Sequence, residues 1–286
     1  MKRFTFYKTL AIGLLLISGN VAIAETDEAS SRSPVSVGLE LNRSTTKYVL
    51  NTARSEPTFA FTQASSAKLL MEEALIRIGY TISPAIEFHG ILGTARPEPG
   101  GLFLLGPRNG LVVGAGISTS PQSNATWKSN FGIEVTHTNV KDSRGSEEGS
   151  GTLSFNTSNG AVTVPAYIIA TGRAELQLTK IELSALATYK TGFTEPYIGA
   201  LYSIARGTLK TKLRTLRAYI CQSPSNPCSE LDATSFTPDG KQDISLDSQM
   251  GLTLGFNAHI ADAMNIGFGA IVGTRTQYSA HVELSF

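Results

Sequence analysis

Hydrolytic chemistry would require a histidine beside a nucleophile or an activated water, with a carboxylate or amide to orient the ring. The sequence offers four histidines: His89, His137, His259 and His281. Ser279, His281 and Glu283 alternate on one face of a predicted strand. Neighbours on such a face lie about 7 Å apart along the strand, too far for direct hydrogen bonds. We therefore expect polar wall residues rather than an enzyme, and no catalytic residue, metal site or cofactor.

The only two cysteines, Cys221 and Cys228, lie in the polar segment "CQSPSNPC". In an exported chain such a pair most simply forms a disulfide. Closing about eight residues would restrict the unfolded chain by about 2.5 kcal/mol. A metal site needs more ligands than this pair offers, and the spacing differs from the C-x-x-C of redox catalysts. We predict a structural disulfide that shapes a loop.

Charged residues recur at alternate positions, which is the spacing of side chains on one face of a β-strand. Apolar and polar residues alternate in stretches about as long as a membrane-spanning strand. The candidate strands are 35–41, 74–82, 86–92, 111–117, 127–135, 153–155, 162–170, 181–189, 197–204, 244–260, 265–272 and 276–286. Segment 153–155 is weak and Pro165 interrupts 162–170, because proline rarely occupies a central strand. The leading count is twelve strands, with eight or ten left open.

The connections alternate between long and short along the chain. Long ones are expected at 43–72, 96–109, 139–151 and 214–243, and short ones at 83–85, 120–124, 158–160, 191–195 and 261–263. Two short connections, near 171–173 and 273–276, fall on the long side. Long loops at one end and tight turns at the other are typical of an outer-membrane barrel. The predicted fold is all-β, an antiparallel transmembrane β-barrel with both ends of the chain on the short-turn side.

If the apolar faces contact lipid, the opposite faces line a lumen. The charges expected there are Glu40, Arg77, Glu87, Lys128, Glu134, Lys180, Glu182 and Glu283. Glycines between them, such as Gly38, Gly255 and Gly267, would thin the wall and leave room. The charges could pair and plug the lumen or line a water-filled path, since buried unpaired charge is costly. Twelve strands favour a small pore and eight a plugged barrel.

The first residues are typical of a secretory signal peptide. Lys2, Arg3 and Lys8 precede the apolar run 10–17, which is too short to span a bilayer as a helix, and Ala24 is the expected cleavage site. We predict a signal peptide at 1–24, a short periplasmic tail at 25–34 and a barrel at 35–286. Residues 25–286 hold 21 basic and 23 acidic side chains, a net charge of −2. This balance gives no indication of a nucleic-acid partner.

The last strand carries an alternating motif that ends the sequence on phenylalanine. Its members are Tyr278, Ala280, Val282, Leu284 and Phe286. This motif resembles the sorting signal of bacterial outer-membrane proteins, which the barrel assembly machinery reads. Segments 76–90, 194–207 and 250–270 resemble OmpA-type barrels, although 95–175 departs from the eight-stranded pattern and no peptidoglycan-binding domain follows. The resemblance implies the outer membrane of a Gram-negative bacterium, with its lipid and lipopolysaccharide as partners.

The predicted function is a small porin-like channel or an OmpA-type structural and surface protein. Three alternatives remain open. A secreted β-sandwich would also alternate, but it would not need aromatic residues at the ends of its apolar faces. An outer-membrane lipase or protease would need a site near the outer rim, where "HTN" (137–139) lacks the serine that follows histidine in lipid A deacylases. An adhesin would act through loops 43–72 and 214–243, and basic residues in 208–219 could contact lipopolysaccharide phosphates.

Overall fold

The structure is a computed structural model of the chain. It describes residues 34–51, 66–83, 85–97, 106–123, 126–157, 160–220, 229–232, 239–261, 263–273 and 275–286. The predicted signal peptide with its cleavage site at Ala24, residues 25–33 of the predicted tail, and the Cys221–Cys228 pair lie outside these residues. In the part of the chain described, no helix is long and apolar enough to cross a membrane.

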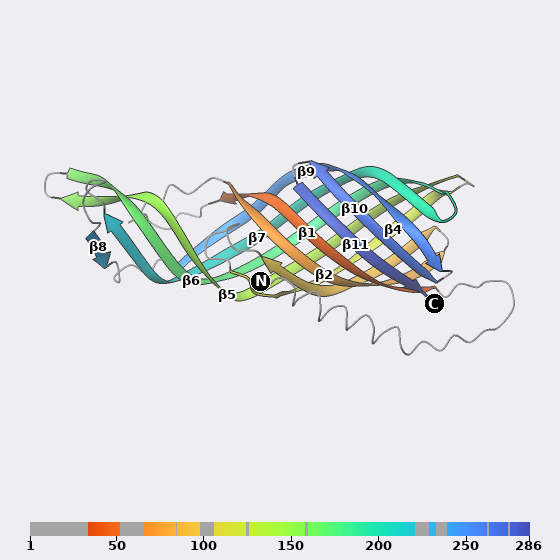
Figure 1. The fold of residues 1–286 in the computed structure, drawn as a ribbon, viewed down its shortest axis with the longest axis horizontal. Coiled ribbons are helices and arrows are strands. Elements are labelled where there is room, and N and C mark those ends of the chain that lie inside the picture. The colour runs from red at the N-terminus through yellow and green to blue at the C-terminus, as the bar shows by residue number, and fades with distance from the viewer. Residues whose placement is uncertain are drawn as a thin grey trace. The chain divides into compact units, whose positions relative to one another are not determined.

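The described residues form antiparallel strands. Their bounds are β1 Val35–Asn51, β2 Ser66–Ser83, β3 Ile86–Pro97, β4 Gly110–Ser123, β5 Trp127–Thr157, β6 Gly160–Tyr189, β7 Thr194–Ile220, β8 Ser229–Asp232, β9 Asp239–Ala261, β10 Met264–Gly273 and β11 Arg275–Ser285. Strands β5, β6 and β7 continue beyond the others at one end, where the short β8 pairs with β7 (Figure 1).

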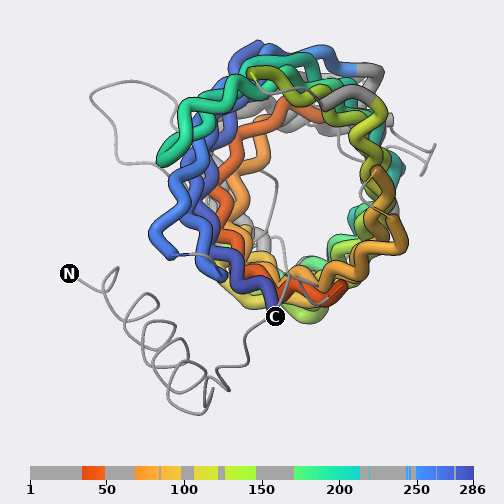
Figure 2. Tube along the Cα trace, turned by 90° about the vertical axis from the view of Figure 1, so that its right-hand side faces the viewer, coloured from red at the N-terminus to blue at the C-terminus, as the bar shows by residue number. Residues whose placement is uncertain are grey.

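Ten of these strands pair in a ring (Figure 2). Each strand from β1 to β7 pairs with the next, β7 pairs with β9, and β9, β10 and β11 follow in order. The ring closes where β11 pairs with β1, from Ser36 opposite Ser285 to Thr46 opposite Arg275. Because every strand has two neighbours, the ring leaves no open edge along this register.

The leading count of twelve strands is wrong, and the ring has ten. Segments 153–155 and 162–170 continue β5 and β6, and Leu153 pairs with Val164 within their long hairpin. The predicted loop 139–151 is also wrong, because those residues remain in β5. A bulge after Val140, with Asp142 at φ 52°, accommodates extra residues in β5, and the strand continues in the same direction. Likewise, the connection predicted near 171–173 lies within β6.

Tight turns gather at one end of the ring, here called the short-turn end. There, two to four residues separate β2 from β3, β4 from β5, β6 from β7, and β9 from β10. The opposite, long-loop end carries the longer intervals 52–65, 98–109 and 221–238. At this end only two residues separate β5 from β6 and only one separates β10 from β11, and the first of these short intervals was expected at the other end. The first residue of β1 and the last residue of the sequence both lie at the short-turn end, where the Phe286 N–H donates to the Val35 carbonyl at 3.1 Å.

The outer wall carries a band of exposed apolar side chains. Its large members include Ile76, Ile78, Tyr80, Phe88, Leu92, Val113, Trp127, Phe131, Ile133, Val135, Ile181, Leu183, Ile198, Leu252, Leu254, Phe256, Phe268 and Tyr278. On β5 the apolar face runs from Trp127 to Val135 and then becomes polar at His137. Nine residues match the length of a tilted strand that crosses a hydrocarbon core. We call the part of the ring nearer the short-turn end the lower ring, and we define the apolar band as its outward apolar residues.

Towards the long-loop end the strand pairing changes. The pairing of β1 with β11 ends at Thr46 opposite Arg275, and beyond it β1 pairs directly with β9, with Val49 opposite Ser245 and Asn51 opposite Asp243. The two strands of the β10–β11 hairpin therefore take no part in the pairing at this level.

Candidate functional site

The inward faces of the lower ring enclose a cavity of about 440 Å³. Seven of the eight charges predicted to face the lumen line it, namely Glu40, Arg77, Glu87, Glu134, Lys180, Glu182 and Glu283. Lys128 lies on the same face of β5 as Glu134 but is not among the lining residues. The cavity extends from residues near the short-turn end, such as Ser36 and Ser118, up to Glu73 on β2 and Arg275 on β11.

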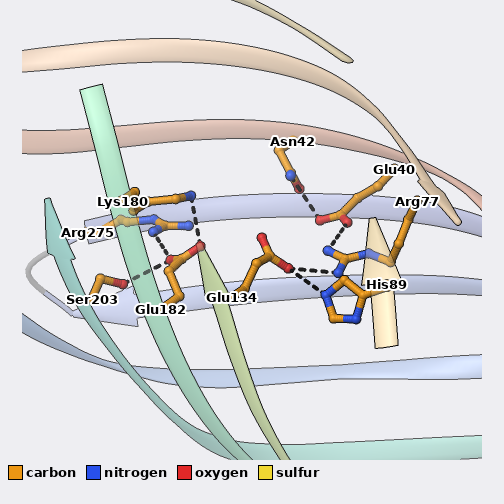
Figure 3. Close-up of polar contacts among 9 residues, drawn as sticks. All are labelled: Glu40, Asn42, Arg77, His89, Glu134, Lys180, Glu182, Ser203 and Arg275. Carbon is orange, nitrogen blue, oxygen red and sulfur yellow. Dashed lines mark hydrogen bonds and ion pairs between the residues drawn. The ribbon is translucent and has the colours of Figure 1, made fainter. Parts of the chain in front are cut away.

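Arg77 organises the first of two polar clusters across the lumen (Figure 3). Its guanidinium donates to Glu134 at 2.7 Å and to Glu40 at 3.0 Å. Glu40 also accepts from the Asn42 amide at 2.9 Å, and His89 Nε2 lies 3.4 Å from the Glu134 carboxylate. The cluster therefore joins β1, β2, β3 and β5 through side chains that are far apart in sequence.

Glu182 organises the second cluster, which joins β6, β7 and β11 (Figure 3). Its carboxylate pairs with Lys180 at 2.8 Å and with Arg275, and it accepts from the Ser203 hydroxyl at 2.9 Å. The sequence reading missed Arg275, because it fell within the predicted turn 273–276. Arg275 lies two residues before Gln277, in the inward phase of the last strand, and this spacing was the available signal.

Buried apolar side chains lie beside the two clusters and beyond them towards the long-loop end, with the inward Glu73 among them on β2. We define the apolar layer as Tyr48, Leu69, Met71, Leu75, Ile91, Val112, Val140, Leu176, Leu178 and Leu209, all buried. Each lies in the inward phase of its strand. Seven strands, β1 to β7, contribute to this layer. The cavity lining includes Leu75 and Val112 from this layer, and it also includes Glu73, two residues farther along β2.

The segment 106–109 closes over the inner wall of β5 at the long-loop end. The buried Ser143 hydroxyl donates to the Gly106 carbonyl and accepts from its N–H, both at 2.8 Å. Arg108 donates to the Asp142 carboxylate at 2.8 Å and to its carbonyl at 2.7 Å, and Arg173 approaches the same carboxylate at 3.1 Å. The hydrogen bond from Arg108, with the charge of Arg173, lowers the pKa of Asp142.

The inward glycines receive the side chains of their neighbours. A Cβ on Gly255 would lie 2.2 Å from the Phe268 carbonyl oxygen and 2.4 Å from the Tyr197 hydroxyl. A Cβ on Gly267 would lie 2.1 Å from the imidazole of His281. The glycines therefore do make room, but aromatic and imidazole rings from the wall occupy it. This packing narrows the lumen instead of widening it.

The residues of the terminal motif lie on the outward phase of β11. Tyr278 and Phe286 are exposed, and Ala280, Val282 and Leu284 are half-buried between them. Ala280 and Val282 pair with Leu41 and Leu39 on β1 and with Phe268 and Ile266 on β10. The motif is thus part of the seam that closes the ring.

The histidines lie in different surroundings. His137 faces outwards and shares a hydrogen bond of 3.0 Å with Thr179, while His259 lies 2.5 Å from Asn265 and 3.3 Å from Glu195 near the short-turn end. Ser279, His281 and Glu283 all line the cavity, and no hydrogen bond joins any two of them. Among the described residues, no three His, Cys, Asp or Glu side chains come close enough to hold a metal ion.

Comparisons with known proteins give a distant likeness only. No family model matches the sequence, and no curated protein matches it. Similar solved structures include the outer membrane protease OmpT from Escherichia coli, with 10% identity, TM-score 0.41, and 91% of this chain and 99% of that chain covered. An outer-membrane channel from Pseudomonas putida F1 has 13% identity, TM-score 0.38, and coverage of 93% and 100%. The translocator domain of the autotransporter NalP from Neisseria meningitidis has 9% identity, TM-score 0.36, and coverage of 98% and 96%.

Proposed function

We propose that the chain is an integral β-barrel of the Gram-negative outer membrane whose lumen is closed, and that it acts as a structural and surface protein. The observation that carries the proposal is the inversion of the lower ring, with an apolar band outside and charged clusters inside. A protein in water would place those faces the other way round. A bilayer also requires every backbone group to be paired, and the closed ring supports that requirement.

Two features of the interior support closure over an open pore. The Arg77 and Glu182 clusters cross the lumen with direct ion pairs, which fix the charges that a pore would leave hydrated. The buried side chains of the apolar layer then pack inside the ring towards the long-loop end. Water and ions avoid an apolar constriction, since they lose hydrogen bonds there without replacement. The porin-like alternative would require this layer to open.

The outer wall supports lipopolysaccharide as a partner. Just beyond the apolar band, Arg206, Lys210 and Lys212 project from the outward face of β7, and Arg173 projects from β6 beside them. Cationic side chains at this height would meet the phosphates of the outer leaflet. The outward motif on β11 makes the barrel assembly machinery the second proposed partner. The histidine surroundings favour no hydrolytic role, so we propose that the protein is not an enzyme.

Conductance of the refolded protein in planar bilayers tests closure. We expect no stable discrete steps from the wild type, with heat-modifiable gel mobility as proof that the barrel is folded. A variant with Tyr48→Ala and Leu209→Ala removes two side chains from the apolar layer and should produce steps. Leu201→Ala, which only enlarges the cavity below the layer, is the matched control and should stay silent. Stable, ion-selective steps from the wild type would replace closure with the porin-like function.

A further inference from the structure

The lumen cavity contains more acidic than basic side chains. Six carboxylates line it, and only three cationic side chains do, so the lining carries a net charge of −3 with neutral histidines. Arg77 and Arg275 already engage Glu40, Glu134 and Glu182. Glu87 and Glu283 make no ion pair with a described residue. Uncompensated charge inside a low-dielectric wall is costly, and a counter-cation removes that cost.

Buried oxygen atoms in the same cavity lack donors. Asn42 and Gln277 each keep only 7% of their surface exposed, and Asn42 Oδ1 and Gln277 Oε1 have no hydrogen-bond partner. Both side chains line the cavity, on the adjacent strands β1 and β11. A buried acceptor without a donor costs roughly 1–3 kcal/mol, so these positions favour a guest that donates hydrogen bonds.

We propose that the cavity binds a small organic cation with ammonium or guanidinium groups, which enters from the short-turn end. About 440 Å³ falls in the range of small-molecule sites. The carboxylates are spread over several strands, with no cluster of three that could hold a metal ion among the described residues, and this spacing suits an extended guest. The apolar layer excludes entry from the long-loop end. The direction of entry therefore rests on the proposed function, whereas the site itself does not.

Glu283 and Glu87 provide the charges that the guest would meet first. Gly38 on β1 pairs with Glu283 on one side and with Arg77 on the other, so Glu283 lies one strand away from the Arg77 cluster. A Cβ on Gly79 would lie 2.5 Å from the Glu87 carboxylate and 2.4 Å from the Ser36 hydroxyl. Glu87 therefore lies close to Ser36, near the short-turn end of the cavity. A diamine held between these carboxylates could reach the deeper acceptors with its second end.

Titration calorimetry of the full, refolded protein in detergent tests the site with three probes of matched length. Putrescine carries two ammonium groups, 1,4-butanediol is its neutral counterpart and succinate its anionic one. We expect saturable binding of putrescine alone. Glu283→Gln and Glu87→Gln should each weaken it at least about tenfold, while Glu195→Gln should leave it unchanged, because Glu195 lies near the short-turn end outside the cavity lining.

Three outcomes would overturn the proposal: no putrescine binding by a folded protein, equal binding of butanediol, or affinity that neither substitution changes. If a glutamine variant fails to fold, the salt dependence of wild-type binding decides instead, because charge-driven affinity must fall as ionic strength rises. Conductance separates this proposal from the previous one. A conducting barrel that still binds putrescine through Glu283 would overturn closure and leave the cation site intact.

Discussion

Arginines in two environments allow a direct test of the interior ion pairs. The Arg77 side chain is 29% exposed between two carboxylates that are each 20% exposed, whereas the Arg108 side chain is 51% exposed. Arg77→Met leaves Glu40 and Glu134 facing each other without their cation. We predict a loss of about 2 kcal/mol in the free energy of unfolding, below the 3–5 kcal/mol of fully buried pairs because water reaches the cavity.

The matched substitution, Arg108→Met, removes an exposed ion pair and should cost less than about 1 kcal/mol. Urea unfolding of both variants in lipid vesicles measures the difference. Equal losses from the two substitutions would mean that the lumen screens charge as effectively as the outer surface does.

The contact between Arg108 and Asp142 can also be followed through the titration of Asp142. Its pKa is lowered because Arg108 donates a hydrogen bond to the ionised carboxylate. A lowered folded pKa means that the contact stabilises the fold above the ordinary pKa of aspartate, and that this contribution is lost as the pH falls through the folded value. Arg108→Gln should therefore raise the pKa of Asp142 towards its ordinary value. Carboxyl NMR titration measures the shift, and an unchanged pKa would assign the effect to Arg173.

Individual inward residues were predictable from the sequence, but their partners were not. Alternation with period 2 was enough to place Glu40, Arg77 and Glu134 on the inward face. Their pairing depends on which strands face each other across the ring, and Arg77 is 57 residues from Glu134. No local pattern encodes that distance. Arg275 was missed for a different reason, since its assignment to a turn hid its inward phase.

Strand boundaries were the weaker part of the prediction, and β5 shows why. Polar residues at 139–151 suggested a loop, because a strand that crosses a membrane must be apolar on its outer face. Beyond the apolar band, however, β5 leaves the proposed bilayer, and its outward face can be polar while pairing with β6 continues. The length over which two strands pair and the length that lies in the bilayer are separate quantities. The alternation of apolar and polar residues indicates only the second.

The pairing of β9 with β10 can be tested at Gly255. An added methyl group would lie 2.2 Å from the Phe268 carbonyl oxygen, a backbone atom that cannot move alone, and 2.4 Å from the Tyr197 hydroxyl. We predict that Gly255→Ala lowers the free energy of unfolding by about 1–3 kcal/mol through overpacking. Gly90→Ala is the control, because nothing lies within 4 Å of its added Cβ on the outer face of β3. Similar urea midpoints for the two variants would contradict the close approach.

The apolar outside and charged inside of the ring predict how the molecule lies in a bilayer. Its single tryptophan can test this position. Trp127 is exposed at the first residue of β5, with its ring centroid 4.9 Å from that of Tyr189. Tryptophan and tyrosine gather at the interface because their rings are apolar and their polar atoms need water. We predict that lipids brominated close to the headgroup quench Trp127 fluorescence more than lipids brominated near the chain end.

The matched control moves the tryptophan along the same outward face. In Trp127→Phe with Ile133→Trp, the probe shifts six residues, or about 20 Å along the strand. With a strand tilt of about 45° it lies roughly 14 Å deeper, close to the centre of a hydrocarbon core about 30 Å thick. The order of quenching should then reverse. If neither tryptophan responds to brominated lipid while the soluble quencher acrylamide reaches both, the apolar band does not face a bilayer. The ring would then have to bury that band against a protein partner.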